Sequence, residues 1–233
     1  MRVHVAFTPA EVASAPVGIV VDVLRATSTI VQALAAGFPR VFCCAEIEEA
    51  RALKAELGGG LLGGERDAIR IEGFDVGASP REFVTRRDEP LILSTTNGTR
   101  AIMTAAAECD DVLIGSLLNL GALASAVRDE GRDVAILCAG FKGTFAFDDA
   151  YCAGRIVSLL GGERTDAAIA AELVARAYPD PLAGLNARTY GPPGLEADIA
   201  FCARESVLDV VPRYAGSVGS GAEIRVGGGG AAG

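Results

Sequence analysis

Residues 17–29 read VGIVVDVLRATST and decide the fold. The first five of these residues form a continuous apolar run, which is typical of a parallel strand buried on both faces. A polar turn from Asp22 to Arg25 follows at once. Residues 27–36 then show the apolar spacing of a helix, with Gly37 as its stop. A buried strand that leads through a polar turn into a helix is the repeating unit of an α/β protein.

The same alternation continues along the chain. Further strands are predicted at residues 3–7, 41–45, 91–94, 112–115 and 134–138, and further helices at residues 47–57, 102–107, 119–128, 149–160, 166–178 and 196–204. This order predicts a three-layer α/β/α fold with a mainly parallel sheet. Aligning Asp22 with Ser94 places Thr27 on Thr99, which is compatible with two similar β-α-β-α halves made by internal duplication. A chance match between short apolar patterns is the alternative.

The length of 233 residues allows one large domain or two small ones. No linker is long enough to separate two independent units. We therefore expect a single α/β domain over residues 1–216 and a flexible, glycine-rich C-terminal tail over residues 217–233, where four consecutive glycines occur.

Composition excludes several classes of partner. A net charge of −9 argues against binding to nucleic acid or to an anionic membrane. The six cysteines have neither Cys-x-x-Cys nor zinc-ligand spacing and lie mainly in apolar runs, so we expect buried, reduced thiols. No apolar run approaches the roughly 18 residues of a membrane span, and no signal-peptide pattern opens the chain. We expect a cytoplasmic protein that binds a small molecule, with a homodimer left open.

Several catalytic classes lack their residues. The one histidine, His4, begins the first predicted strand and is interpreted as a surface or edge residue, which argues against a catalytic triad or a histidine-rich metal site. No cysteine-phosphatase loop and no Walker A motif occurs. Residues 58–63 match a dinucleotide fingerprint in spacing but follow a predicted helix, so they are interpreted as a glycine-rich loop. The remaining carboxylates, hydroxyls, guanidinium groups and amides suit metal-assisted hydrolysis or anion binding.

Three polar turns carry those groups, at residues 22–29, 94–100 and 139–149. Each follows a predicted strand and opens a predicted helix. Because the carboxyl ends of parallel strands meet at one edge of a sheet, the three turns are expected to share a crevice. Helix-start N–H groups, hydroxyls and guanidinium groups bind phosphate, and carboxylates bind a divalent cation. The turns therefore predict an anion site that contains a metal.

Each turn also has a purely structural interpretation. Asp22 is a candidate metal ligand beside phosphate-binding Arg25, Thr27 and Ser28, or else Thr27 or Ser28 caps the helix while Asp22 pairs with Arg25. In the second turn an anion cradle is favoured over an Asn-Gly hairpin. The residues of that cradle are Thr96, Asn97, Gly98, Thr99 and Arg100.

The carboxylates of the later segments are equally open. One of Asp148 and Asp149 is expected to cap a helix, while the other binds a metal or activates water. Glu65 and Asp75 are either ligands of a hard cation or members of an ion-paired surface loop.

Seven stretches taken together resemble the 2-phosphosulfolactate phosphatase family. In chain order they are VVDVLRATSTI, GER, GFDVGASP, STTNGTRA, IGSLLN, CAGFKGTFAFDDAYCAG and DIAFCAR. The resemblance implies an α/β enzyme of the coenzyme M route that uses magnesium to remove phosphate from 2-phospho-3-sulfolactate. The family's shared polar positions fall on Asp22, Arg25, Glu65, Arg66, Asp75, Thr96, Asn97 and Asp149. Ala78, Asp148 and a short segment around residues 191–194 depart from the family pattern and bear on the substrate more than on the chemistry.

These residues give a mechanistic hypothesis. Mg²⁺ is expected on Asp22, Glu65 and Asp149, with Asp75 as a further candidate ligand. Asp22, Asp149 and Asn97 are the predicted catalytic residues. Arg25, Arg66, Arg100 and Lys142 supply the cations for a small anionic phosphoester. Direct attack by water and an aspartyl phosphate on Asp22 both stay open. A non-catalytic anion-binding protein, or a phosphatase for another small phosphoester, is the rival interpretation.

Overall fold

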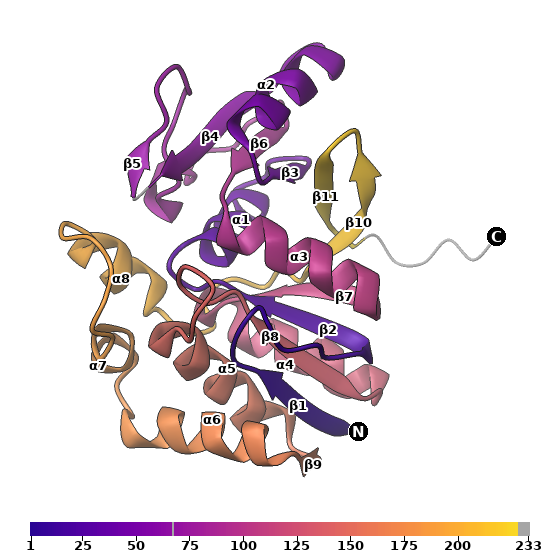
Figure 1. Cartoon of the computed structure of the whole chain (residues 1–233), viewed down its shortest axis with the longest axis vertical. Coiled ribbons are helices and arrows are strands. Elements are labelled where there is room, and N and C mark those ends of the chain that lie inside the picture. The colour runs from indigo at the N-terminus through magenta and orange to yellow at the C-terminus, as the bar shows by residue number, and fades with distance from the viewer. Residues whose placement is uncertain (67, 228–233) are drawn as a thin grey trace.

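The structure, a computed structural model, describes residues 1–66 and 68–227. These residues form an α/β fold with a mixed, mainly parallel sheet of 11 strands and with eight α-helices (Figure 1). The strands are β1 (Arg2–Ala6), β2 (Ala15–Val21), β3 (Val41–Cys44), β4 (Leu61–Arg66), β5 (Ile69–Arg70), β6 (Leu91–Ser94), β7 (Cys109–Gly115), β8 (Val134–Cys138), β9 (Glu163–Arg164), β10 (Pro212–Val218) and β11 (Gly221–Val226). The helices are α1 (Ala26–Ala35), α2 (Ile47–Glu56), α3 (Asn97–Glu108), α4 (Leu120–Glu130), α5 (Phe147–Leu160), α6 (Asp166–Ala177), α7 (Pro181–Asn186) and α8 (Glu196–Cys202).

Two groups of parallel strands make up most of the sheet. The smaller group is β4–β6–β3 and the larger is β7–β2–β8–β1–β9. The β10–β11 hairpin joins them, because β11 pairs antiparallel with β3 and β10 pairs antiparallel with β7. Three antiparallel pairings in succession mean that the two groups run in opposite directions across the hairpin.

The two β-α-β-α segments predicted from the sequence are present, and each contributes one strand to each group. In the first segment β2 joins the larger group and β3 the smaller one; in the second, β6 joins the smaller group and β7 the larger one. Strand β2 lies between β7 and β8, and β6 lies between β3 and β4. The chain therefore crosses between the groups, which places the turns after β2 and β6 near each other. Their origin by duplication stays a prediction.

Helices α1 and α3 lie between the two strand groups (Figure 1). Helices α4, α5 and α6 cover the outer face of the larger group, and α2 covers the outer face of the smaller one. The arrangement therefore has more layers than the predicted three, because α1 and α3 form one helical layer that packs against both strand groups. All of residues 26–34 in α1 are buried, as expected of a helix packed on both sides.

The predicted C-terminal tail is wrong for residues 217–226. They complete β10 and form β11, where Ala222 and Ile224 are buried with the period of two that a strand requires. Gly219, with a φ of 53°, forms the turn between the strands. The flanking polar residues and glycines concealed this pattern in the sequence. Residues 228–233 lie outside the described part of the chain.

The glycine-rich segment after α2 also differs from the sequence prediction, because residues 61–66 form strand β4 instead of continuing a loop. The structure shows why β4 needs glycine at position 64. A Cβ on Gly64 would stand 2.7 Å from the carbonyl oxygen of Ser94, so only glycine lets β4 approach β6 this closely.

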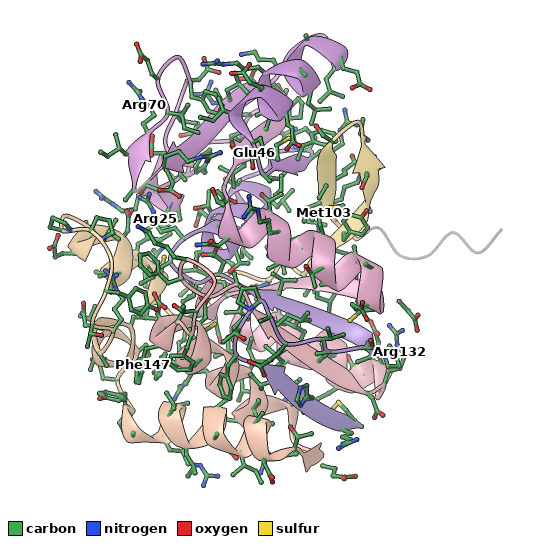
Figure 2. The ribbon with its side chains drawn as sticks, viewed as in Figure 1. Arg25, Glu46, Arg70, Met103, Arg132 and Phe147 are labelled. Carbon is green, nitrogen blue, oxygen red and sulfur yellow. The ribbon has the colours of Figure 1, made fainter. Side chains whose placement is uncertain are left out.

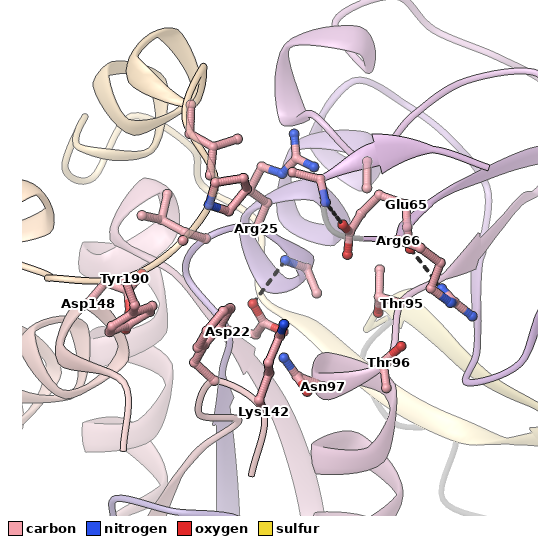
Figure 3. Close-up of a pocket in the computed structure, with 18 of the residues that line it drawn as sticks. Asp22, Arg25, Glu65, Arg66, Thr95, Thr96, Asn97, Lys142, Asp148 and Tyr190 are labelled. Carbon is pink, nitrogen blue, oxygen red and sulfur yellow. Dashed lines mark hydrogen bonds between the residues drawn. The ribbon is translucent and has the colours of Figure 1, made fainter. Parts of the chain in front are cut away.

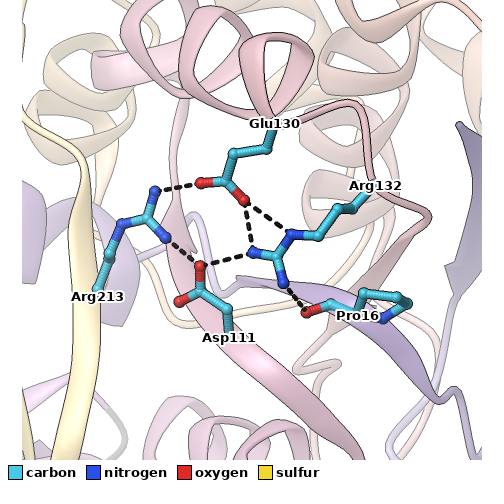
Figure 4. Close-up of polar contacts among 5 residues, drawn as sticks. All are labelled: Pro16, Asp111, Glu130, Arg132 and Arg213. Carbon is cyan, nitrogen blue, oxygen red and sulfur yellow. Dashed lines mark hydrogen bonds and ion pairs between the residues drawn. The ribbon is translucent and has the colours of Figure 1, made fainter. Parts of the chain in front are cut away.

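An ion network anchors the hairpin to the larger group (Figure 4). Arg213 of β10 donates to Asp111 of β7 and, at 2.7 Å, to Glu130 at the end of α4. Arg132 joins the same two carboxylates, with 3.2 Å between its Nη2 and Asp111, and it also donates to the carbonyl of Pro16 at 3.2 Å. The network ties β10 to β7, which share only one registered residue pair.

The expectation for the cysteines is confirmed, since all six are buried. His4 bonds to Thr165 at 3.1 Å between Nδ1 and Oγ1, and it does not line the main pocket described below. Across residues 1–66 and 68–227, no helix has both the length and the apolar character to cross a membrane.

Candidate active site

A pocket of about 450 Å³ opens where the ends of strands from both groups meet (Figure 3). Residues that follow β2, β6 and β8 line it, together with the end of β4. Its acidic side chains are Asp22, Glu65 and Asp148, and its cationic side chains are Arg25, Arg66, Arg100, Lys142 and Arg188. The crevice predicted from the three polar turns is therefore present.

Three helices begin at this pocket, because α1, α3 and α5 start at or just after residues that line it. The N-terminus of each helix carries a partial positive charge. No side chain caps α3. Thr95, Thr96 and Asn97 line the pocket at the start of α3, so the N–H groups of the first turn face a ready anion site.

Asp22 stands at the base of the pocket, directly after β2. One carboxylate oxygen accepts the N–H of Ala26 at 3.3 Å and so caps α1. Burial raises the pKa of Asp22 to about 7; the Ala26 hydrogen bond lowers it, while the negative charges of Asp148 and Glu65 add to the rise. Asp22 therefore changes its charge near neutral pH, unlike an ordinary carboxyl group.

Thr27 and Ser28, predicted to bind substrate, hold the Asp22 turn instead. The Thr27 hydroxyl donates to the Asp22 carbonyl at 2.9 Å and accepts its N–H at 3.1 Å. The Ser28 hydroxyl donates to the carbonyl of Val23 at 2.7 Å. Both side chains are fully buried and neither lines the pocket.

The α3 cradle is divided in a similar way. Thr96, Asn97 and Arg100 line the pocket, whereas Gly98 and Thr99 are buried beneath it. The Thr99 hydroxyl donates to the carbonyl of Cys44 at 3.3 Å, which ties α3 to the end of β3. Thr99 thus positions the cradle and does not form part of its surface.

Arg25 pairs with a carboxylate that the sequence did not indicate. Its Nη1 lies 2.6 Å from Asp198 in α8, and both side chains are more than nine-tenths buried. Asp198 also accepts the hydroxyl of Ser79 at 2.6 Å. The alternative in which Arg25 pairs with Asp22 is not found; Arg25 instead holds α8 against the pocket wall.

Arg66 is held by neutral groups. Its guanidinium donates to the carbonyl oxygens of Glu65 and Ala45, each at 2.8 Å, and to the Ser94 hydroxyl at 3.1 Å. These contacts join the ends of β3, β4 and β6 while leaving a positive charge in the wall. Arg100 reaches Glu46, just before α2 (Figure 2), at 3.3 Å in an exposed pair.

Asp148 and Asp149 are both buried, but they have different partners and only Asp148 lines the pocket. The two oxygens of Asp149 accept the N–H groups of Val23 at 2.9 Å and Gly140 at 3.0 Å, and Asp149 is buried and does not line the pocket. Burial, followed by the charges of Asp148 and Asp22, holds its pKa well above the usual range. Asp149 therefore joins two strand ends, and Asp148 is the carboxylate that α5 presents to the pocket.

The predicted metal ligands do not converge as a set. Asp75 lies outside the pocket, where it accepts the N–H of Leu62 at 2.8 Å and pairs with Lys54 at 3.2 Å. The backbone hydrogen bond from Leu62 is the main reason why the pKa of Asp75 is lowered. Among residues 1–66 and 68–227, no three His, Cys, Asp or Glu side chains gather closely enough to hold a metal by themselves. The three-carboxylate site of Asp22, Glu65 and Asp149 is thus not formed.

The sequence prediction missed the wall formed by the 187–195 loop, between α7 and α8. Arg188 and Tyr190 of this loop line the pocket, and the Tyr190 hydroxyl donates to Asp148. The Tyr190 ring stacks on Phe141, with 4.7 Å between ring centres. The one feature of the sequence that could have indicated this wall is an aromatic residue, Tyr190, next to a Gly-Pro-Pro-Gly loop. Apolar periodicity does not show that Tyr190 contacts Asp148 and Phe141.

Comparison with known proteins places the whole pocket within one matched region. A family model described as 2-phosphosulpholactate phosphatase matches residues 5–217. A "Probable 2-phosphosulfolactate phosphatase" of Pseudothermotoga lettingae is 40% identical over 91% of this chain and 95% of the relative. A protein of the same description from Thermus thermophilus is 40% identical over 94% of this chain and 97% of the relative. One from Carboxydothermus hydrogenoformans is 36% identical over 91% and 92%, respectively.

Proposed function

The chain belongs to the 2-phosphosulfolactate phosphatase family, which makes it a phosphoric monoester hydrolase, and we propose that its substrate is 2-phospho-3-sulfolactate or a closely similar anionic three-carbon phosphoester. We further propose that the reaction needs Mg²⁺ and yields sulfolactate and phosphate. In its family this reaction would serve coenzyme M biosynthesis.

One observation carries the proposal for the reacting end of the substrate: Asp22 lies beside the uncapped start of α3 in the same pocket. The helix start offers N–H groups and partial positive charge to a phosphate. Asn97 adds an amide at that point, and Arg100 adds a guanidinium one turn along the helix. A phosphate bound here would place its phosphorus near the Asp22 carboxylate.

The pocket residues fit a magnesium ion when the substrate is counted among its ligands. Mg²⁺ is commonly held by one or two carboxylates together with phosphate oxygens and water, so a complete protein cage is not needed. Asp22, Glu65 and Asp148 line the same pocket, and two of these charges raise the pKa of the third. A cation would relieve this crowding of negative charge. Asp22 and Glu65 are the ligands we propose.

When bound, Mg²⁺ supplies Lewis-acid polarisation of the phosphoryl group. The residues of the chain supply the rest. The α3 start and Asn97 orient the phosphate, Arg100 and Arg66 offset its charge, and the apolar side chains of Leu24 and Leu195 limit water at the wall. Ionised Asp22 is available either to orient a water molecule or to attack phosphorus, and both routes are compatible with its position.

Phosphate release from a panel of three-carbon phosphoesters, with and without Mg²⁺, tests the proposal. We expect 2-phospho-3-sulfolactate to be the best substrate and turnover to stop in chelator. A better rate with a phosphoester that lacks the sulfonate would reassign the substrate. Undiminished turnover in chelator would reject the role of the metal while leaving the phosphatase assignment in place.

A further inference from the structure

Four side chains form a continuous stack on one side of the pocket. The rings of Phe141 and Tyr190 are 4.7 Å apart with an angle of 24° between their planes. The guanidinium of Arg188 lies 6.0 Å from the centre of the Tyr190 ring, and the ammonium of Lys142 lies 5.5 Å from the centre of the Phe141 ring. All four residues line the pocket. We call them the aromatic–cation stack.

Buried contacts fix this stack in place. The Tyr190 hydroxyl donates to Asp148, which is 4% exposed at the start of α5. Arg188 donates from Nη1 to the carbonyl oxygen of Tyr190, so its guanidinium is bound to the same loop. The stack therefore joins the 187–195 loop to the turn at residues 140–144 as a preformed wall.

Among the described residues Arg188 has no carboxylate at ion-pair distance, although burial raises the pKa of Asp148 and the charge of Arg188 partly offsets that rise. By contrast, Arg25 and Arg100 each have a carboxylate partner. A planar guanidinium over an aromatic ring keeps most of its donors available in the plane, and its fork matches carboxylate and sulfonate oxygens.

Figure 3 shows Tyr190 away from the start of α3, whereas Lys142, at the other end of the stack, is drawn next to Asn97. Tyr190 and Asp148 are on one side of Asp22, and Thr95 and Thr96 are on the other (Figure 3). A phosphate held at the start of α3 would thus direct the remainder of the molecule toward the stack. The proposed substrate carries a carboxylate and a sulfonate there, and these groups need cations that do not take part in the reaction.

We propose that the aromatic–cation stack is the subsite for the non-reacting acid groups of the substrate, with Arg188 as the residue that determines specificity. This inference rests on the proposed function for the identity of the phosphoester. It assigns to the stack a preference for a ligand with an acid group beside the phosphate-bearing carbon.

Kinetics on two substrates tests the subsite. The first substrate is 2-phospho-3-sulfolactate and the second is glycerol 2-phosphate, which has the phosphate but no carboxylate or sulfonate. Loss of a charge-assisted hydrogen bond predicts that Arg188→Ala raises KM for the first substrate by about tenfold or more. The ratio of kcat/KM between the two substrates should fall by a similar factor, because the second substrate makes no such contact. Arg188→Lys should recover part of the ratio.

Arg204 offers a matched control, since it also lies over an aromatic ring, that of Phe201 at 3.6 Å, but does not line the pocket. Arg204→Ala should leave the substrate ratio at its wild-type value. Thermal melting of each variant reports whether the fold is retained. An equal loss on both substrates in Arg188→Ala, or no loss on either, would overturn the subsite.

Direct binding separates failure of the subsite from failure of the proposed function. Sulfolactate without phosphate should bind wild-type protein in calorimetry, and Arg188→Ala should weaken this binding by about tenfold or more. If sulfolactate binds in an Arg188-dependent way while no phosphoester is hydrolysed, the subsite stands and the proposed reaction fails. If hydrolysis occurs while sulfolactate binding is independent of Arg188, the subsite fails and the proposed reaction stands.

Discussion

The backbone of Gly98 lies directly against the carboxylate of Asp22. A Cβ built on Gly98 would stand 2.9 Å from Oδ2 of Asp22 and 2.5 Å from the Cβ of Ala26. Glycine at this position lets the start of α3 approach the turn after β2, and this approach brings the anion-binding helix end beside the buried carboxylate. The two segments come from different β-α-β-α units, so the contact joins the halves of the pocket.

Gly98→Ala is expected to lower both stability and kcat/KM. The added methyl group has no space, because Ala26 and Asp22 are already in contact with this position, and overpacking of this kind costs about 1–3 kcal/mol. We expect at least about a tenfold loss of kcat/KM, since a small displacement of the phosphate site misaligns the reacting groups. Thermal melting and steady-state kinetics measure the two effects.

The double variant Ala26→Gly with Gly98→Ala is the control, because it removes the Cβ that the new methyl group would meet. Stability should recover in part, while activity should stay low since Oδ2 of Asp22 is still too close. Full recovery of activity in the double variant would show that contact with Ala26, and not with Asp22, sets the requirement for glycine.

Asp22→Asn separates stability from activity. A folded pKa of about 7 against an ordinary value of 3.8 means that the folded protein holds a proton that the unfolded chain has lost between these two pH values. Asp22 therefore lowers stability progressively as pH rises through this window, by up to about 4 kcal/mol above pH 7. Asn carries no charge, so we expect Asp22→Asn to melt higher than wild type at pH 8 and close to wild type at pH 4. Activity should fall by at least about 10²-fold. A lower melting temperature at pH 8 would contradict the raised pKa.

Much of this arrangement could be predicted from the sequence because it depends on local patterns. Apolar runs identified β2 and β6, and the polar turns after them located Asp22 and Asn97 at the pocket. The principle that parallel strand ends meet at one edge then supplied the convergence.

The remainder depends on long-range packing that no local pattern encodes. Residue type predicts a metal-ligand role for Asp149, but the N–H groups of Val23 and Gly140 occupy both of its oxygens. Asp75 belongs to a loop that folds back onto Lys54 of α2. Thr27 and Ser28 have the right hydroxyls but bond to their own turn. In each case the fold satisfied the polar group internally, which residue type alone does not reveal.

The dependence on Mg²⁺ should vary with pH in a specific way. Metal binding needs ionised Asp22, so the ion competes with a proton at a group whose pKa is raised to about 7. The apparent affinity for Mg²⁺ should be about tenfold weaker at pH 6 than its limiting value and should level off above pH 7. Calorimetric titration at pH 6, 7 and 8 in buffers of different ionisation enthalpy would also detect the released proton. An affinity that does not change with pH would exclude Asp22 as a ligand.

Arg66→Ala is expected to weaken the pocket wall as well as substrate binding. The substitution leaves the Ala45 and Glu65 carbonyl oxygens without their donor and detaches the end of β4 from β3. Loss of such hydrogen bonds costs about 1–3 kcal/mol in sum. We expect a lower melting temperature together with a higher KM. Arg66→Lys keeps the positive charge but not the forked set of donors, so its KM should stay nearer the wild-type value than its melting temperature does. A variant with near-normal melting temperature and a strongly raised KM would show that Arg66 acts mainly on the substrate.

The hairpin network gives a prediction about stability that does not involve the pocket. Burial opposes ionisation of Glu130, but hydrogen bonds from Arg132 and Arg213 outweigh it, so the pKa of Glu130 is lowered. A lowered folded pKa contributes stability that is present above the ordinary value of 4.5 and is lost as the pH falls through the folded value. Arg213→Met should therefore cost about 1 kcal/mol near pH 7 and less at pH 3, because lowering the pH toward the folded pKa of Glu130 weakens the bond between Glu130 and Arg213. Arg225→Met is the matched control on the same hairpin, because Arg225 pairs with Glu223 of its own strand and not with β7 or α4. Chemical denaturation at both pH values measures the difference. An equal loss for the two variants at pH 7 would mean that Arg213 does not anchor the hairpin, since the connection to Asp111 and Glu130 is what distinguishes Arg213 from Arg225.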